Sequence, residues 1–340
     1  MRYGLEQAFI LPLPKYSGPH PSEKTHQEEI EENSQIAIWR SSLDKIRDRK
    51  LGWEQFLNSL PDGPRDLRSH PAARLACDRN GQSLLHLAVS QERYDIVDLL
   101  AGDILLRSRR NNHGLSPLEL AQFLHRIPAI QSLGNNSFFS FCSQPNVEIV
   151  GPSHKLEHLS YLPYPIYENV EIFDEILDRT CKSKLEDEIP PEKIWMGIYF
   201  DKEIQTGLNP RVSIRWIDDE VGFGVFAEQR IPSCAFVGEY TGVIKERRKR
   251  YLKDKTYCVR YTTWPVGRRK FVIDAENQGN YTRFINHSAK PNIGLQSVYW
   301  RGLPRMIFIT LKEIPEGSQL TFDYGNSFWK EIKQIPKLLT

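Results

Sequence analysis

The sequence has few cysteines, and none of them is placed to form a zinc site or a redox motif. Its five cysteines are scattered over 340 residues without a C-x-x-C pair, which indicates a reducing compartment rather than a disulfide framework. Long apolar runs are missing too, since no stretch approaches the roughly 18 residues of a membrane helix. The short apolar run near the N-terminus carries Glu6 and two prolines, so it makes a poor signal peptide. We therefore expect a soluble, intracellular chain that contacts no membrane.

A large excess of one charge sign is also missing from the chain as a whole, which carries a net charge of +2 from 45 basic and 43 acidic residues. The two parts differ, however: residues 201–340 hold 23 Lys/Arg and 15 Asp/Glu, whereas residues 1–200 hold 22 and 28. At roughly 100–200 residues per domain, the length predicts two or three domains, and the charge split indicates units with different partners. The basic part fits either contact with nucleic acid or a solvated basic face.

The first part of the chain shows helical periodicity after a polar arm. Prolines and an acidic run over residues 1–33 predict a flexible arm. Ile36, Trp39, Leu43 and Ile46 then recur at spacings of three and four, which predicts a helix with one apolar face.

An internal repeat follows. Gly81 and Gly114 are 33 residues apart, and the blocks SLLHLA (83–88) and SPLELA (116–121) align without a gap. The period and the core pattern resemble the ankyrin repeat, which implies a helical domain over 34–130 that binds a protein partner. A chance repeat in two unrelated helical hairpins is the alternative.

The segment over 131–205 has mixed features, and we interpret it as a connector that packs on both neighbours. SFFSFC (137–142) fits a short strand or a buried hook, FDEILDRT (173–180) an amphipathic helix, and EDEIPPEK (186–193) an exposed loop.

Short β-like runs punctuated by turn residues dominate the rest of the chain. Together with the helical first part, they predict a multidomain α+β protein. The predicted strands cover residues 212–216, 225–226, 236–240, 257–261, 271–274 and 306–311.

Four motifs in this β region stand in a specific order. VGFG (221–224) comes first, followed by EYTG (239–242), GNYTRFINHSAKPN (279–292) and LTFDYG (320–325). This order resembles the SET-domain protein-lysine methyltransferases over about residues 210–330. The helical repeats upstream and the FW pair downstream are most similar to the euchromatic histone methyltransferases.

The resemblance implies a mainly β SET fold over 206–326, with a pseudoknot, and a short C-terminal helix over 327–340. It implies S-adenosylmethionine as the cofactor and a protein lysine, first of all in a histone tail, as the methyl acceptor. Tyr324 is then the catalytic tyrosine, and Tyr240 a channel aromatic that orients the lysine. The cofactor-binding residues that the resemblance implies are Val221, Gly222, Phe223, Gly224, Tyr257, Arg283, Asn286, His287, Phe328 and Trp329.

Several of these positions allow a second interpretation or show a departure from the family. Arg283 fits a brace of the threaded segment as well as a cofactor contact, and Trp329 also fits a core position. Phe322 stands where the family has Phe or Tyr, and Phe leaves room for di- or trimethylation. Ala289 stands where a zinc-binding cysteine is common, so we expect no metal.

Substrate and partners have alternatives. A groove for a basic tail would draw on Glu239, Asp254, Asp274 and Glu276, and the basic run over 245–250 is predicted as an exposed helix or a contact with nucleosomal DNA. A non-histone substrate and an inactive scaffold are the alternatives to histone methylation. A histone substrate implies the nucleus, which would be the host nucleus for a secreted bacterial effector; otherwise we expect the cytoplasm.

Overall fold

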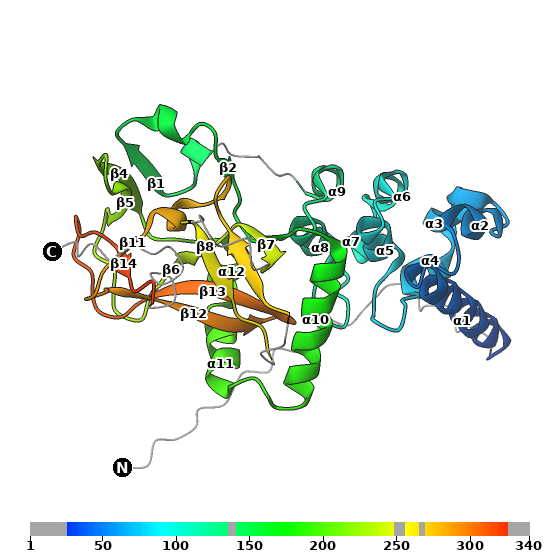
Figure 1. Cartoon of the computed structure of the whole chain (residues 1–340). Coiled ribbons are helices and arrows are strands. Elements are labelled where there is room, and N and C mark those ends of the chain that lie inside the picture. Colours follow the sequence, from blue (N-terminus) through cyan, green and yellow to red (C-terminus); the bar gives the residue numbers. More distant parts are fainter. Residues whose placement is uncertain (1–25, 135–140, 248–255, 265–268, 326–340) are drawn as a thin grey trace, which may run out of the picture.

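The computed structural model describes residues 26–134, 141–247, 256–264 and 269–325. Figure 1 shows helices at one end, short strands at the other and helix α10 (Val170–Leu185) between them. One continuous cluster of buried apolar side chains runs from the helices into the strands. No helix within the described ranges is long and apolar enough to cross a membrane.

The helical stack begins earlier than predicted. Its first helix starts at His26, so the arm predicted over 1–33 is too long. Residues 26–33 of the acidic run are helical, in keeping with the helix preference of Glu and Gln. The stack comprises α1 (His26–Arg47), α2 (Trp53–Asn58), η1 (Gly63–Arg65), α3 (Asp66–Ser69), α4 (Pro71–Leu75), α5 (Leu84–Ser90), α6 (Tyr94–Leu100), α7 (Ile104–Ser108), α8 (Pro117–Phe123) and α9 (Ile127–Leu133).

Two copies of one turn-and-helix-pair unit form the second half of this stack. Gly81 and Gly114 close equivalent tight turns and have φ angles of +72° and +81°, a region that favours glycine. The Asn112 N–H donates to the Asn80 carbonyl over 3.0 Å and joins the two turns. The internal repeat is thus confirmed as the equivalent pairs α5–α6 and α8–α9. Its assignment to the ankyrin family stays a prediction.

The connector is more helical than predicted. Helix α10 contains the predicted helix 173–180 and is capped by Asn169, whose Oδ1 accepts a hydrogen bond from the Ile172 N–H over 2.9 Å. The loop predicted over 186–193 is shorter, because α11 starts at Pro191. Proline fits the first turn of a helix, so the proline pair marks a helix start. The other connector elements are η2 (Phe141–Ser143), β1 (Val147–Val150), η3 (Ser153–Leu156), β2 (Ser160–Tyr161), β3 (Ile166–Tyr167), α11 (Pro191–Tyr199) and α12 (Asp201–Thr206).

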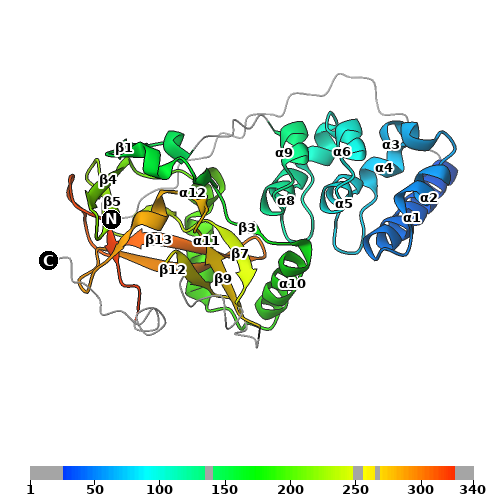
Figure 2. The same ribbon diagram turned by 45° about the horizontal axis from the view of Figure 1, so that its top comes forward.

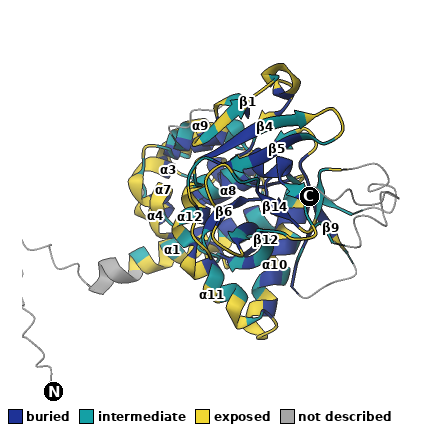
Figure 3. Cartoon of the chain, turned by 90° about the vertical axis from the view of Figure 1, so that its left-hand side faces the viewer, coloured by how far each residue is buried: buried dark blue, intermediate teal, exposed yellow. Residues whose placement is uncertain are grey.

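Small sheets rather than one large sheet make up the β body. The strand orders are β3-β7-β9-β8, β12-β13-β6 and β1-β4-β5, and two-stranded pairs join β10 to β2 and β11 to β14. Figure 3 shows that β5 and β6 are largely buried. The strands and the one short helix of the body are β4 (Val212–Asp218), β5 (Gly222–Ala227), β6 (Phe236–Glu239), β7 (Val243–Glu246), β8 (Cys258–Tyr261), β9 (Phe271–Asp274), β10 (Gln278–Gly279), η4 (Tyr281–Phe284), β11 (Asn286–His287), β12 (Ile293–Trp300), β13 (Leu303–Thr310) and β14 (Thr321–Phe322).

The predicted strands are confirmed in β4, β5, β6, β8, β9 and β13, but β7 and β12 were not predicted. The basic run over 245–250 is not a helix where it is described: Lys245 and Glu246 end β7 and pair with Val272 and Phe271 of β9. Strand pairing overrides the helix preference of these residues. Glycine, glutamine and serine interrupt the apolar pattern of β12, so this half-buried edge strand was not recognised from the sequence.

The helical stack is fixed to the β body by aromatic and ionic contacts. Phe123 of α8 packs against Phe173 of α10 with ring centroids 6.4 Å apart. Arg301, in the turn between β12 and β13, donates to Glu119 Oε1 over 2.5 Å and to Asp201 Oδ1 over 3.1 Å. Figure 2 shows α8 and α10 next to each other at this junction.

The buried His86 makes the stability of the helical stack depend on pH. Its Nδ1 lies 2.8 Å from Ser83 Oγ, and its Nε2 lies 2.9 Å from the Leu115 carbonyl oxygen. Burial lowers the pKa of His86 from 6.5 to about 4, so the ring is neutral in the folded state near neutral pH.

We predict that acidification destabilises the stack through His86. Its contribution is complete above the unfolded pKa of 6.5 and falls by about 3 kcal/mol as the pH drops to about 4, because only the unfolded chain then binds the proton readily. Denaturant unfolding followed by tryptophan fluorescence between about pH 7 and pH 4 measures this. His86→Gln should flatten the pH dependence, whereas the exposed control His158→Gln should keep it. An equal slope in both variants would contradict the assignment.

Candidate active site

The parallel pair β11–β14 brings two distant motifs together. Its register places Asn286 opposite Thr321 and His287 opposite Phe322. Just after β14, the N–H of Tyr324 donates to His287 Nδ1 over 3.2 Å, and the two rings lie 5.4 Å apart. This pair is the contact at which the predicted pseudoknot would form; the crossing of the chain itself stays a prediction.

Two tyrosine hydroxyls are held by backbone carbonyls in this region. The Tyr324 hydroxyl donates to the Ile285 oxygen over 2.9 Å, and the Tyr240 hydroxyl donates to the Tyr257 oxygen over 2.9 Å. Burial raises the pKa of Tyr324 and of Tyr240 well above their usual value. Both groups are therefore neutral hydroxyls at physiological pH, fixed in direction and unsuited to act as bases.

Aromatic rings form the apolar wall beside these hydroxyls. Phe322 lies 4.8 Å from the Tyr324 ring and 5.0 Å from the Phe308 ring, and Phe308 lies 6.3 Å from Tyr240. The wall consists of aromatic rings, and its ring at position 322 carries no polar group.

The glycine motif forms a cradle against Asn286. A Cβ on Gly224 would come within 2.7 Å of Gln319 Nε2 and 3.2 Å of Asn286 Nδ2, so no side chain fits there without movement of its neighbours. Asn286 Nδ2 donates to the Phe223 carbonyl over 3.1 Å. Gln319 Nε2 is buried and has no hydrogen-bond partner among the described residues. Gly222 has a φ of +77°.

Arg283 braces the segment that carries this site. Its Nε donates to the Ala275 oxygen over 2.7 Å and its Nη2 to the Glu276 oxygen over 2.9 Å, and its guanidinium lies 3.8 Å from the centre of the Tyr257 ring. These contacts support the bracing interpretation. Its contact with a cofactor stays a prediction.

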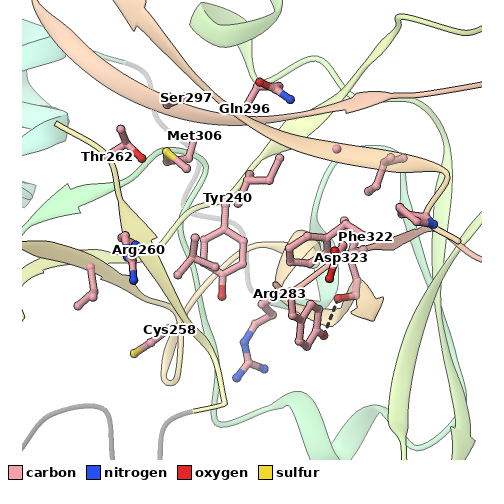
Figure 4. A pocket seen from close by; sticks show the side chains of 18 of the residues that line it. Tyr240, Cys258, Arg260, Thr262, Arg283, Gln296, Ser297, Met306, Phe322 and Asp323 are labelled. Atoms are coloured by element: carbon pink, nitrogen blue, oxygen red, sulfur yellow. Dashed lines mark hydrogen bonds between the residues drawn. The ribbon is translucent and has the colours of Figure 1, made fainter. Parts of the chain in front are cut away.

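A cavity of about 550 Å³ opens beside the two tyrosines. Of the predicted residues, Tyr240, Arg283, Phe322 and Tyr324 line it (Figure 4). The other predicted residues that the structure describes lie outside the cavity lining; they are Val221, Gly222, Phe223, Gly224, Tyr257, Asn286 and His287. Four of them, Phe223, Tyr257, Asn286 and His287, are joined to the site by the contacts given above. Phe328, Trp329, Asp254 and residues 137–140 fall outside the described residues.

The prediction of an acidic groove is wrong for two of its carboxylates. Glu239 is buried and accepts two hydrogen bonds from Arg305, the one from Nε to Oε1 being 2.5 Å long. Asp274 is also buried and lies 3.3 Å from Lys245 Nζ. Both carboxylates are neutralised inside the fold.

Some groups at the site were not predicted. Ile285 supplies the acceptor for Tyr324, Cys258 and Arg260 of β8 line the cavity, and Arg305 pairs with Glu239, the residue before Tyr240. Glu239 and Arg305 are 66 positions apart, so only the fold reveals their pairing. No cluster of three or more His, Cys, Asp or Glu suited to a metal ion occurs in the described part of the chain.

Comparison with known families identifies the region built by these contacts. The family profile named SET domain matches residues 222–325. The chain contains a SET domain. It is related to histone-lysine methyltransferases. The match covers Gly222–Gly224 of the glycine motif and both strands of the β11–β14 pair, which brings the segment with Asn286 and His287 to the segment before Tyr324.

Several curated proteins are similar to this SET domain. Histone-lysine N-methyltransferase SETD2 of Mus musculus is 37% identical over 114 residues, which are 32% of this chain and 4% of that protein. EHMT1 of Mus musculus is 33% identical over 134 residues, 38% of this chain and 10% of that protein. SUV39H1 of Xenopus laevis is 30% identical over 133 residues, 37% of this chain and 32% of that protein. The chain thus spans a third or less of the length of these relatives.

A solved structure of KRYPTONITE in complex with mCHH DNA, H3(1-15) peptide and SAH is also similar. It is 29% identical, covers 35% of this chain and 24% of that chain, and has a TM-score of 0.30.

We predict that Glu239→Gln destabilises the SET domain by about 3 kcal/mol, because it leaves the Arg305 guanidinium buried without a counter-charge. Denaturant unfolding measures the loss. The control Glu228→Gln changes a half-exposed carboxylate that lies 2.6 Å from Arg215 Nη2, and it should cost about 1 kcal/mol or less. Equal losses in the two variants would show that the buried pair is not a special support.

Proposed function

We propose that the protein is an S-adenosylmethionine-dependent protein-lysine N-methyltransferase. The observation that carries the proposal is the placement of the Tyr324 hydroxyl with Tyr240 and Phe322 at one cavity, where it donates to the Ile285 carbonyl, while the next residue, Asn286, bonds to the glycine motif at Phe223. The relationship to histone-lysine methyltransferases supports it. Retention of the cradle and of both hydroxyls speaks against an inactive scaffold.

The residues around the cradle fit the cofactor. S-adenosylmethionine supplies, when bound, a methyl group on a positively charged sulfur. The backbone of Gly222–Gly224 and the side chains of Asn286 and His287 would hold it, because a chain without side-chain bulk and with oriented polar groups suits a large polar ligand. The buried, unpartnered Gln319 Nε2 beside Gly224 adds a donor that a ligand can satisfy.

The chain's own residues prepare the attacking amine. A free lysine has a pKa near 10.4, so its ammonium must release a proton to solvent water before the neutral amine can attack the methyl group. The aromatic walls of Tyr240 and Phe322 exclude water and favour the neutral amine. The fixed oxygens of Tyr324 and Tyr240 then orient it. Catalysis in this site is alignment and desolvation rather than acid–base chemistry by the tyrosines.

An extended peptide fits the cavity better than a small molecule. β8 ends the sheet β3-β7-β9-β8 and β12 ends the sheet β12-β13-β6, and residues 258–260 of β8 and 293–297 of β12 line the cavity together. Two strand edges that face one groove offer backbone donors and acceptors to a third strand laid between them. A lysine on that strand would reach Tyr240.

The names of the relatives favour histone tails as the substrate, with the nucleus as the site of action, and the helical stack would dock a protein partner. Phe322 lacks the hydroxyl that would hold a water beside the amine, so we propose di- or trimethyl-lysine as the product. Methylation of a non-histone protein is the second candidate, and the charge of the groove favours it.

Removal of the Tyr324 hydroxyl should abolish activity without loss of the fold. We predict that Tyr324→Phe lowers methyl transfer from labelled S-adenosylmethionine to core histones or to a lysine peptide by about a hundredfold or more, since the ring still packs but the oriented oxygen is gone. Calorimetric binding of the cofactor should be retained. The control Tyr94→Phe, in α6, should keep wild-type activity. Activity of Tyr324→Phe within twofold of wild type would refute the role.

A hydroxyl at position 322 should limit the product. We predict that Phe322→Tyr shifts the product from di- or trimethyl-lysine toward monomethyl-lysine, because the new hydroxyl and its water take up the space of a methyl group. Mass spectrometry of the reacted peptide measures the ratio. Phe226→Tyr, in β5 and outside the cavity lining, is the matched control. A wild-type enzyme that makes only monomethyl product would disprove the assignment.

A further inference from the structure

The cavity carries an excess of positive charge. Lys193, Arg247, Arg260 and Arg283 line it, whereas Asp323 is the one carboxylate residue among the described residues of its lining. The basic charge of this half of the chain is therefore concentrated, in part, where the substrate would lie.

Arg260 is the cation best placed to meet a substrate. It is exposed on the edge strand β8. Figure 4 shows it on one side of Tyr240, with Phe322 and Asp323 on the other side. A residue next to the target lysine on a strand along β8 would come close to its guanidinium.

The opposite edge of the groove adds a second cation. Lys193, at the start of α11, donates from Nζ to Gln296 Oε1 of β12 over 2.8 Å. The groove thus has a positive group on each of its two edges, Arg260 on β8 and Lys193 beside β12.

Two nearby carboxylates are already paired with other cations, whereas the exposed Glu276 and Asp323 offset part of the positive charge. Asp274 lies 3.3 Å from Lys245 Nζ, and Glu246 lies 2.9 Å from Arg269 Nη2. A basic peptide in the groove would meet like charges at both edges, which costs binding free energy.

We propose that this methyltransferase selects a lysine flanked by acidic residues, and that Arg260 is a residue that determines this specificity. The proposal rests on the proposed function and narrows its substrate class: the partner is an extended, acidic protein segment rather than a strongly basic tail. Charge complementarity between the groove edges and the flanking carboxylates carries the selection.

A matched pair of peptides tests the proposal. Both carry one central lysine, with glutamates on both sides in one and arginines on both sides in the other. For the wild-type protein we expect kcat/KM to be about fivefold or more higher for the glutamate peptide at low salt. The difference should shrink at about 0.5 M salt, where screening shortens the reach of exposed charges.

Variants of Arg260 separate a local effect from the net charge. Arg260→Glu should reverse the preference, and the milder Arg260→Gln should reduce it. Arg65→Glu makes the same charge change at an exposed position of the helical stack and should keep the wild-type preference. A preference that follows Arg65→Glu as strongly as Arg260→Glu would overturn the role of Arg260.

The outcomes distinguish the two levels of inference. Equal rates, faster transfer to the arginine peptide, or transfer to core histones but to neither peptide would overturn the acidic-substrate proposal and leave the methyltransferase in place. Transfer to no peptide and to no histone, together with no binding of S-adenosylmethionine by calorimetry, would overturn the proposed function itself.

Discussion

The parallel contact between β11 and β14 is the constraint on which the active site depends. Its register sets the Ile285 carbonyl within reach of the Tyr324 hydroxyl and Asn286 within reach of the glycine motif. A shift by one residue would turn these side chains to the opposite face. Because each strand has only two residues, the register needs outside support. Asn292 gives it, since its Oδ1 accepts from the Thr321 N–H over 2.9 Å and its Nδ2 donates to the Gln319 oxygen over 2.8 Å.

Buried polar groups around the cavity are arranged to hold position rather than to exchange protons. The hydroxyls of Tyr240 and Tyr324 are neutral, and each has a backbone acceptor. The Glu239 carboxylate, at the end of the strand β6 that leads to Tyr240, is matched by Arg305 of β13. Such a site orients a nucleophile that must be uncharged when it reacts. The charged side chains lie at the edges of the groove, where they affect which substrate binds.

Features that depend on short sequence motifs, such as turns and repeats, could be predicted from the sequence. Features that depend on contacts between residues far apart in the chain could not. The turns at Gly81 and Gly114 require a conformation that glycine favours, so the repeat was visible. The order of four motifs pointed to the region around Tyr324. The segment at the start of α11, around Pro191, was predicted as a loop because proline is common both in loops and in the first turn of a helix. The prediction that Glu239 contributes to an acidic groove was wrong because its partner, Arg305, is far away in sequence. Without knowledge of that partner, a carboxylate cannot be recognised as paired inside the fold.

The hairpin of β12 and β13 contributes both to the groove and to the junction with the helical stack. Its pairing is continuous from Ile293 opposite Thr310 to Trp300 opposite Leu303. One end forms an edge of the groove, and the turn at the other end holds Glu119 of the helical stack through Arg301. A paired hairpin of this kind is stiff along its length, so it is a rigid connection between the groove edge and the helical stack. The edge of the groove and the anchor of the helical stack therefore belong to one paired unit, so a change in the length of this hairpin would displace one relative to the other.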